Sequence, residues 1–242
     1  MVFHFKQFSL NHDRSTMKIG TDAVLLSALT NVGAAQSLLD IGCGCGVVAF
    51  CVAQQLAKIS AYAQIFGVDL DAESIAEAKD NAQHYGLLPE TNFHFQQTSV
   101  QEFAKNYPEQ FDLIVSNPPF FNQDLKPENV SRLKSKHSDG QLSFQELIDS
   151  VCKLLKDDGR FVVILPKREG DEFDELASSY LHCTRRIFIQ PTERKPIHRL
   201  ILEYQKKNGV PCQEHRLIIR TSDNSYSEDY VRLMEAYLIS VK

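Results

Sequence analysis

The residues with the clearest chemistry lie in a short glycine-rich segment. A buried strand is predicted at Leu38–Ile41, and it runs directly into Gly42-Cys43-Gly44-Cys45-Gly46 before a helical pattern begins. Alternate glycines let the backbone of a turn approach a ligand closely, because they carry no side chain and accept left-handed conformations. This G-x-G-x-G spacing, with Asp40 just upstream, favours S-adenosylmethionine over the pyrophosphate cofactors that accompany G-x-G-x-x-G.

A second acidic residue closes the next predicted strand, which ends in Gly67-Val68-Asp69. A carboxylate at that position can accept hydrogen bonds from the ribose hydroxyls of a nucleoside cofactor. A dinucleotide site and a glycine-rich connection without a ligand are the alternatives. We interpret Cys43 and Cys45 as small side chains packed in the turn, rather than as redox or metal-binding groups.

A third group follows the predicted strand 111–116, where the chain continues as Asn117-Pro118-Pro119-Phe120. Ligands of open α/β sheets gather beyond the carboxyl ends of the strands, which places this motif beside the glycine turn. The two prolines hold the Pro118 carbonyl in a set direction, and the Asn117 amide oxygen is a second acceptor. Two acceptors suit an NH₂ group conjugated to a ring or carbonyl, on which Phe120 can stack. Methyl transfer to such a nitrogen needs positioning more than a strong base, and a plain strand-ending turn is the alternative.

The elements that must position these motifs alternate in the manner of βαβ units. The pattern predicts a doubly wound α/β fold with a seven-stranded, mostly parallel sheet. Thr21-Asp22 is expected to cap the first helix, and Gly86 and Gly159 to stop later ones. Strands are expected at 37–41, 65–68, 92–97, 111–116, 159–165, 184–189 and 200–204, helices at 22–29, 47–56, 72–85, 100–106, 143–155, 169–181 and 227–238, and a further strand and turn at 209–227.

Composition limits the partners of the chain. The 26 Lys and Arg residues against 31 Asp and Glu give a net charge of -5, so nucleic acid can be bound only through local basic patches. The apolar runs are much shorter than a membrane span and the first residues lack a signal-peptide pattern, so we expect a cytoplasmic protein without membrane contact. The six cysteines lack C-x-x-C spacing, which favours reduced thiols and no metal site.

With both motifs in place, the chain resembles the amino-methyltransferases that carry N-P-P-[FY], and among them the bacterial tRNA(Val) adenine-N6 methyltransferases. The narrower resemblance runs nearly end to end, through Phe3-x-Phe5-x-x-Phe8, 17–26, 195–203 and Tyr226-Ser227-x-x-Tyr230. It implies a Rossmann-like class I methyltransferase that uses S-adenosylmethionine in tRNA modification. Its target would be the exocyclic amine of the adenosine 3′ of the anticodon.

The resemblance also implies which residues form the site. Residues 1–242 would form a single methyltransferase domain, in which 1–36 are an extension whose helix packs at the cofactor site. In this family an acidic residue usually follows the third strand, whereas this chain has Ser99 there. Asn117, Pro118, Pro119 and Phe120 would hold the adenine, and the cofactor would be bound by Lys18, Gly20, Thr21, Asp22, Asp40, Gly42, Gly44, Gly46, Asp69, Leu70, Ser99, Val100 and Asn117.

An anionic protein that binds tRNA must do so through clusters of basic residues. One cluster, Arg132-x-Lys134-x-Lys136, lies in the stretch after Asn117–Phe120, and a second includes Lys195 and Arg199. Each could equally be a solvated surface. The sequence sets no oligomeric state and is compatible with a monomer.

Other methyl acceptors fit the same motifs. A side-chain amide presents a similar NH₂ group, so a protein-glutamine methyltransferase of the release-factor type is one alternative. Such enzymes carry a helical domain before the glycine turn, whereas only 37 residues precede Leu38 here. Ribosomal RNA guanine-N2 and DNA adenine methyltransferases usually carry an added domain. A non-catalytic binding module is the alternative from another class, and eroded motifs would support it, but both motifs are intact.

Overall fold

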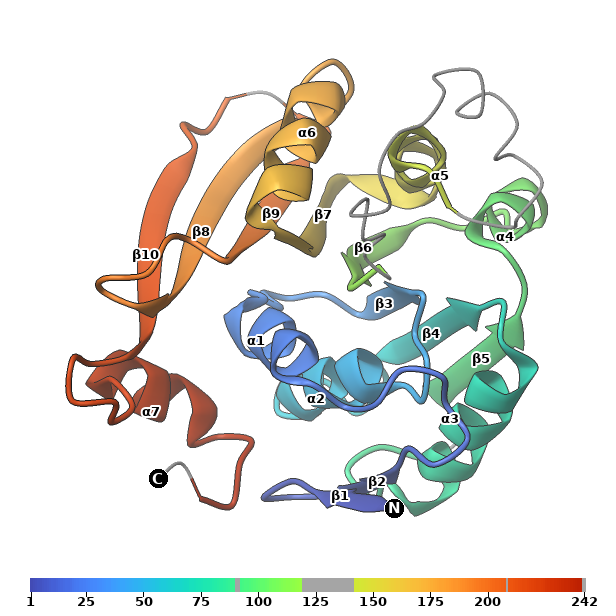
Figure 1. Ribbon diagram of the computed structural model, residues 1–242. Helices are drawn as coiled ribbons and strands as arrows, with labels where there is room; N and C mark the ends of the chain where they lie inside the picture. The colour runs from blue at the N-terminus through green and yellow to red at the C-terminus, as the bar shows by residue number, and fades with distance from the viewer. Residues whose placement is uncertain (90–91, 119–141, 208, 241–242) are drawn as a thin grey trace, which may run out of the picture.

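The computed structural model describes residues 1–89, 92–118, 142–207 and 209–240 of the chain. Within these residues the large sheet has eight strands, in the order β10-β8-β9-β7-β6-β3-β4-β5 (Figure 1). β9 runs antiparallel to its neighbours β7 and β8, and the other pairs are parallel. The strands are β3 (Ser37–Ile41), β4 (Gln64–Asp69), β5 (Phe93–Gln97), β6 (Phe111–Ser116), β7 (Leu155–Pro166), β8 (His182–Thr192), β9 (Arg199–Gln205) and β10 (Gln213–Arg220).

The predicted doubly wound, mostly parallel α/β fold is confirmed, but the sheet has one strand more than the seven expected. The additional strand is β10, which pairs in parallel with β8, with Gln213 opposite Arg185 and Arg220 opposite Thr192. A strand was expected in this stretch, but its pairing partner was not. Hydrophobic periodicity can predict a strand, but it does not indicate which distant strand will pair with it.

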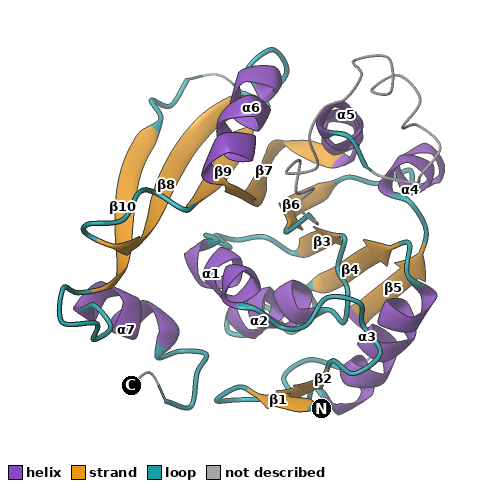
Figure 2. Ribbon diagram, in the orientation of Figure 1, coloured by secondary structure: helices purple, strands orange, loops and turns teal. Residues whose placement is uncertain are grey.

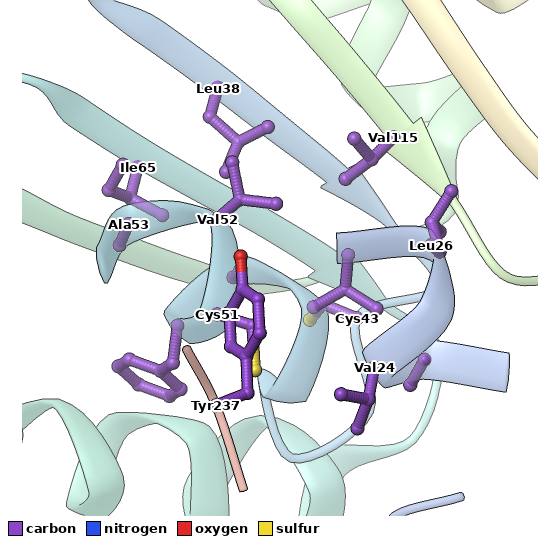
Figure 3. Close-up of a cluster of buried hydrophobic side chains, with 14 of the residues drawn as sticks. Val24, Leu26, Leu38, Cys43, Cys51, Val52, Ala53, Ile65, Val115 and Tyr237 are labelled. Atoms are coloured by element: carbon purple, nitrogen blue, oxygen red, sulfur yellow. The ribbon is translucent and has the colours of Figure 1, made fainter. Parts of the chain in front are cut away.

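Helices cover both faces of the sheet (Figure 2). One face buries side chains from α1, α2, α3 and α7, and the other buries side chains from α4, α5 and α6. Figure 3 shows part of the first core, which includes Val24 and Leu26 of α1, Leu38 of β3, Val52 of α2 and Val115 of β6. The helices are α1 (Thr21–Leu29), α2 (Val47–Leu56), α3 (Ala72–His84), α4 (Val100–Asn106), α5 (Phe144–Leu154), α6 (Lys167–Ala177) and α7 (Glu228–Met234).

A small antiparallel hairpin, which the sequence analysis did not predict, opens the chain. Its strands are β1 (Val2–His4) and β2 (Ser9–Asn11), each too short to show a period. The hairpin lies against α3, because the Asn11 amide donates to Asn81 Oδ1 at 2.8 Å and the Phe8 ring lies 4.9 Å from that of Tyr85. The same Asn81 side chain donates through Nδ2 to the Cys45 carbonyl at 3.1 Å, so this contact is joined to the glycine turn.

Local signals set most helix ends, with two corrections. Gly86, with φ of 74°, follows the end of α3 as expected. Gly159 does not stop a helix but lies inside β7, where an added Cβ would be only 2.9 Å from the Phe111 carbonyl oxygen. The helix near residue 21 begins at Thr21, with Gly20 as N-cap and no side-chain cap, so Thr21 and Asp22 lie within its first turn.

α3 and α5 differ from the expected ranges by a single residue at one or both ends, and two other helices differ by more. α6 begins at Lys167 rather than 169 and ends at Ala177 rather than 181. α7 begins as expected after Ser227, whose side chain accepts from the Tyr230 amide, but it ends at Met234 rather than 238. The first and last turns of a helix contain too few residues for the sequence pattern to locate the helix end.

Candidate active site

The glycine turn joins β3 to α2 in left-handed backbone conformations. Gly42, Gly44 and Gly46 have φ values of 72°, 54° and 86°, which side-chain-bearing residues rarely adopt. The amides of Gly42 and Cys43 donate to the Val68 carbonyl at 2.8 and 3.1 Å, so the turn is bound to the end of β4. The alternate spacing therefore reflects a backbone requirement.

The three glycines face different surroundings. Apart from the adjoining residues, no atom of the described chain lies within 4 Å of a Cβ built on Gly42 or Gly44. A Cβ on Gly46 would lie 2.6 Å from the Phe50 ring. The first two glycines thus border open space and line a pocket. Gly46, which was expected to bind the cofactor, is packed against the core and does not line that pocket.

Two carboxylates lie behind the turn. Asp40 is 1% exposed, and its Oδ2 accepts a hydrogen bond from the Ala49 amide at 2.9 Å. Burial, helped by the nearby charge of Asp69, raises the pKa of Asp40 to about 7. Asp69 accepts from the Gly44 amide through Oδ2 at 2.8 Å and from the Asp71 amide through Oδ1 at 2.9 Å. Neither carboxylate lines the pocket, and Asp69 holds Gly44 in place.

A pocket of about 580 Å³ lies in front of the turn, within the usual size range of small-ligand sites. One side comes from the N-terminal residues, the glycine turn and the end of β6, and the other from β8, β9, β10 and α7. Its lining residues are Met17, Lys18, Gly20, Thr21, Asp22, Ala23, Leu25, Gly42, Cys43, Gly44, Cys45, Val47, Val48, Asn117, Ile189, Pro191, His198, Arg199, Ile219, Arg220, Tyr226 and Tyr230.

Asn117 brings an unsatisfied acceptor to this pocket. It directly follows β6, whose last residue, Ser116, donates through Oγ to the Ile41 carbonyl at 2.9 Å and so ties β6 to β3. Asn117 Oδ1 is buried and accepts no hydrogen bond from the described residues. Buried acceptors without a partner are rare and call for an explanation. A donor on a bound ligand would satisfy this oxygen.

Lys18 and Asp22 line the pocket as expected, but both are engaged by the protein. The Lys18 ammonium donates to the carbonyls of His12, Asp13 and Ser15 at 2.9, 2.9 and 3.0 Å. Asp22 Oδ2 forms an ion pair with Arg199 Nε at 2.8 Å, and the Arg199 side chain is only 18% exposed. Arg199, expected to contact RNA, instead connects β9 to α1.

Several predicted residues lie elsewhere. Leu70 is 55% exposed, Val100 is buried, and Ser99 caps α4 by accepting from the Glu102 amide at 3.2 Å. None of the three lines the pocket. Pro118 is half-buried, and Lys195 is exposed in the turn between β8 and β9. Pro119, Phe120, Arg132, Lys134 and Lys136 lie outside the described residues.

One wall of the pocket, from the C-terminal part of the chain, was not predicted from the sequence. Ile219, Arg220, Tyr226 and Tyr230 line the pocket, although none was assigned to the site. The rings of Tyr226 and Tyr230 stack with centroids 4.8 Å apart. Two aromatic residues four positions apart around a helix start were a usable signal, because side chains at that spacing meet on one helix face.

The cysteines of the turn behave as packed side chains. Cys43 and Cys45 are buried. Burial raises the pKa of Cys45 to about 11 and that of Cys43 well above its usual value, so both thiols stay protonated at neutral pH. In the described part of the chain, no cluster of His, Cys, Asp or Glu is arranged to hold a metal ion. No helix within that part is long and apolar enough to cross a membrane.

Comparison with known proteins identifies the family. A model of the methyltransferase domain matches residues 33–208. The tRNA1(Val) (adenine(37)-N6)-methyltransferase of Yersinia pestis strain Pestoides F is 36% identical, over 98% of this chain and 94% of that protein. The enzyme of the same name from Yersinia pseudotuberculosis serotype O:3 is also 36% identical, over 98% of this chain and 92% of its own length. This chain belongs to that methyltransferase family.

Solved structures agree with this methyltransferase assignment at the level of fold. A predicted O-methyltransferase from Agrobacterium tumefaciens superposes with a TM-score of 0.66 at 16% identity, covering 89% of this chain and 96% of that one. Precorrin-6y C5,15-methyltransferase from Geobacter metallireducens superposes with a TM-score of 0.51 at 18% identity, covering 83% and 95%. The predictions of a class I fold, of methyltransferase activity and of S-adenosylmethionine as cofactor are confirmed.

Proposed function

We propose that this methyltransferase modifies N6 of the adenosine 3′ of the anticodon, adenine 37, in tRNA1(Val). The Yersinia relatives carry this activity in their names, and they match nearly the whole chain. The observation that carries the proposal is the buried, unpartnered Asn117 Oδ1 in the same pocket as Gly42 and Gly44. An exocyclic amine has the N–H donor that this oxygen lacks.

The residues on the cofactor side fit S-adenosylmethionine. Gly42 and Gly44 leave open the space in which side chains would otherwise stand, and Asp69 fixes the Gly44 amide. Gly20, Thr21 and Asp22 border the same space at the start of α1. Leu70, Ser99 and Val100 would border the adenosine end, beyond β4 and β5. When bound, the cofactor supplies an electrophilic methyl group on a positively charged sulfur.

The substrate side would hold the amine. Asn117 Oδ1 would accept one N–H, and the Pro118 carbonyl would accept the other. With both N–H bonds directed to these acceptors, the nitrogen lone pair is turned out of conjugation with the ring. Pro119 and Phe120 would complete the cradle, with the Phe120 ring stacked on the base, a contact worth roughly 1–3 kcal/mol. Preorganised polar groups of this kind lower the barrier without a strong base.

The rest of the chain would serve the tRNA. In the proposal residues 1–242 act as a single domain in the cytoplasm, and residues 1–36 complete the cofactor side. Lys195 would contact the tRNA backbone together with Arg132, Lys134 and Lys136. Methylation of a base outside a duplex needs little unstacking, which favours an anticodon-loop target.

The test is a methylation assay with a defined product. Purified protein is incubated with labelled S-adenosylmethionine and fractionated tRNA, and the labelled nucleosides are identified after digestion. We expect N6-methyladenosine in valine tRNA, and none in a transcript whose adenosine 37 is replaced by guanosine. Labelled N2-methylguanosine without N6-methyladenosine would refute the proposal.

A further inference from the structure

Three cationic side chains line the pocket, and they differ in their partners. The Lys18 ammonium is surrounded by three backbone carbonyls, and the Arg199 guanidinium is paired with Asp22. Arg220 forms no ion pair with a carboxylate of the described residues. Its side chain is partly exposed at the pocket, so the guanidinium is accessible to a ligand. An anionic group on a ligand would compensate this positive charge.

Arg220 is held in one orientation. Its guanidinium carbon lies 4.0 Å from the centre of the Tyr226 ring, and its Nη1 donates to the Asn224 carbonyl at 2.6 Å. Asn224 has a φ of 69°, and its amide donates to the Thr221 carbonyl at 3.1 Å, so a tight turn presents the carbonyl that receives Arg220. Left-handed residues other than glycine are uncommon and persist where the surroundings enforce them. The turn and the ring thus preorganise one guanidinium edge toward the pocket.

The sheet register places more positive charge beside Arg220. Arg220 lies opposite Thr192, the last residue of β8, and the turn that follows carries Glu193, Arg194 and Lys195, all exposed. The buried side chain of Gln190 stabilises this turn: its Nε2 donates to the Glu193 carbonyl at 3.1 Å and to the Lys195 carbonyl. Arg194 and Lys195 exceed Glu193 by one charge, so the turn beside Arg220 keeps a net positive charge at the surface.

We propose that Arg220 binds a backbone phosphate of the RNA next to the target nucleotide. This inference rests on the proposed tRNA substrate. Arg194 and Lys195 continue the contact along the strand. A guanidinium suits this role, because its planar fork of donors matches phosphate oxygens. The other candidate anion is the single carboxylate of the cofactor. An RNA strand carries one phosphate per nucleotide, so it can also contact the neighbouring Arg194 and Lys195. Tyr226 and the Asn224 carbonyl are positioning groups for Arg220.

The test compares Arg220→Gln with Lys58→Gln, which removes the same charge from an exposed site after α2, at the amino ends of the strands. Binding of valine tRNA is measured at several salt concentrations with saturating S-adenosylhomocysteine, and calorimetry gives the affinity for S-adenosylhomocysteine alone. For Arg220→Gln we expect tRNA affinity to fall about tenfold, the effect of one charge-assisted hydrogen bond. The magnitude of the log–log salt slope should fall by about 1. Lys58→Gln should match the wild type in both measurements.

Two further variants separate a contact from a structural role. Tyr226→Leu should raise the KM for tRNA and leave kcat nearly unchanged, and Tyr226→Phe, which keeps the ring, should restore the wild-type KM. If Arg220→Gln loses affinity for S-adenosylhomocysteine but keeps its tRNA affinity and salt slope, the anion is the cofactor carboxylate and the inference is wrong. An unchanged Arg220→Gln, in a protein that still methylates tRNA, overturns this inference alone. A wild-type protein that methylates no tRNA overturns the proposed function as well.

Discussion

The two walls of the pocket are built in different ways. The glycine wall, formed by Gly42, Gly44 and Asn117, lies at the carboxyl ends of β3 and β6 and is shaped by backbone. The tyrosine wall, formed by Ile219, Arg220, Tyr226 and Tyr230, is shaped by side chains that contact one another. The first wall depends on residues close together in sequence or on adjacent strands. The second depends on where β10 and α7 come to lie.

This difference separates two requirements of catalysis. A cofactor shared by many enzymes can be held by a turn that recurs with little change, whereas a particular RNA needs its own charges and surfaces. In the proposed function Gly42 and Gly44 hold the cofactor, which every methyltransferase of the fold must do, whereas Asn117 holds the amine. The tyrosine wall would then add the contacts that a particular RNA needs. Substitutions at five positions test the glycine wall and the residues behind it, from the largest expected effect to the smallest.

Asn117→Ala removes the acceptor assigned to the reacting amine. We expect the single-turnover rate with saturating cofactor to fall on the order of a hundred- to a thousandfold, as for loss of a preorganised polar partner. Affinity for S-adenosylhomocysteine should stay near the wild-type value, since this oxygen is assigned to the substrate. Asn117→Asp keeps an acceptor of the same size and should retain more activity than the alanine variant. A wild-type rate for Asn117→Ala would mean that the motif is only a turn.

Gly46→Ala and Gly44→Ala separate the packed and open faces of the turn. Both residues have positive φ, but only Gly46 has ring atoms in the way of a new Cβ. Gly46→Ala should lower the free energy of unfolding by about 3 kcal/mol, combining strain with overpacking. Gly44→Ala should lower it by about 1 kcal/mol, yet weaken S-adenosylhomocysteine binding more. Urea denaturation and calorimetry check both, and equal losses of stability would contradict this contrast.

Asp40→Asn tests the buried carboxyl behind the turn. The pKa of Asp40 is about 7 in the folded chain against 3.8 for the ordinary group, so the folded state keeps the proton to higher pH. The stabilising contribution of the protonated Asp40 carboxyl is complete below pH 4 and is lost as the pH rises through 7. Asparagine stays neutral, so the variant should gain about 2 kcal/mol relative to the wild type between pH 5 and pH 8. Denaturation at both pH values measures this, and a pH-independent difference would rule it out.

Ser99→Asp should have the smallest effect. Ser99 is the N-cap of α4, and aspartate caps a helix about as well as serine, so stability should change by less than about 0.5 kcal/mol. If the cofactor's adenosine end lies beyond β5, the added carboxylate should tighten S-adenosylhomocysteine binding by roughly threefold to tenfold, through one hydrogen bond. Unchanged affinity in calorimetry would place the adenosine end elsewhere.

The sequence predicted the glycine wall well because its signals are local. The turn at Gly42–Gly46 and the strand leading into Asn117 are each set by neighbouring residues. The roles of Gly46 and Arg199 could not be read in the same way. Gly46 faces the ring of Phe50, and Arg199 meets an aspartate 177 residues away, so both depend on tertiary packing.

The position of β9 has a consequence for the order in which the chain can assemble during synthesis. β9 lies between β7 and β8, so β8 has no place in the sheet until residues 199–205 have left the ribosome. β10 then needs β8, and α7 follows β10. The early strands β3 to β6 can pair sooner, since domains form progressively as the chain emerges. A nascent chain therefore has its glycine turn long before it has a closed pocket, and a chain that stops short of residue 220 can present the turn but not the opposite wall.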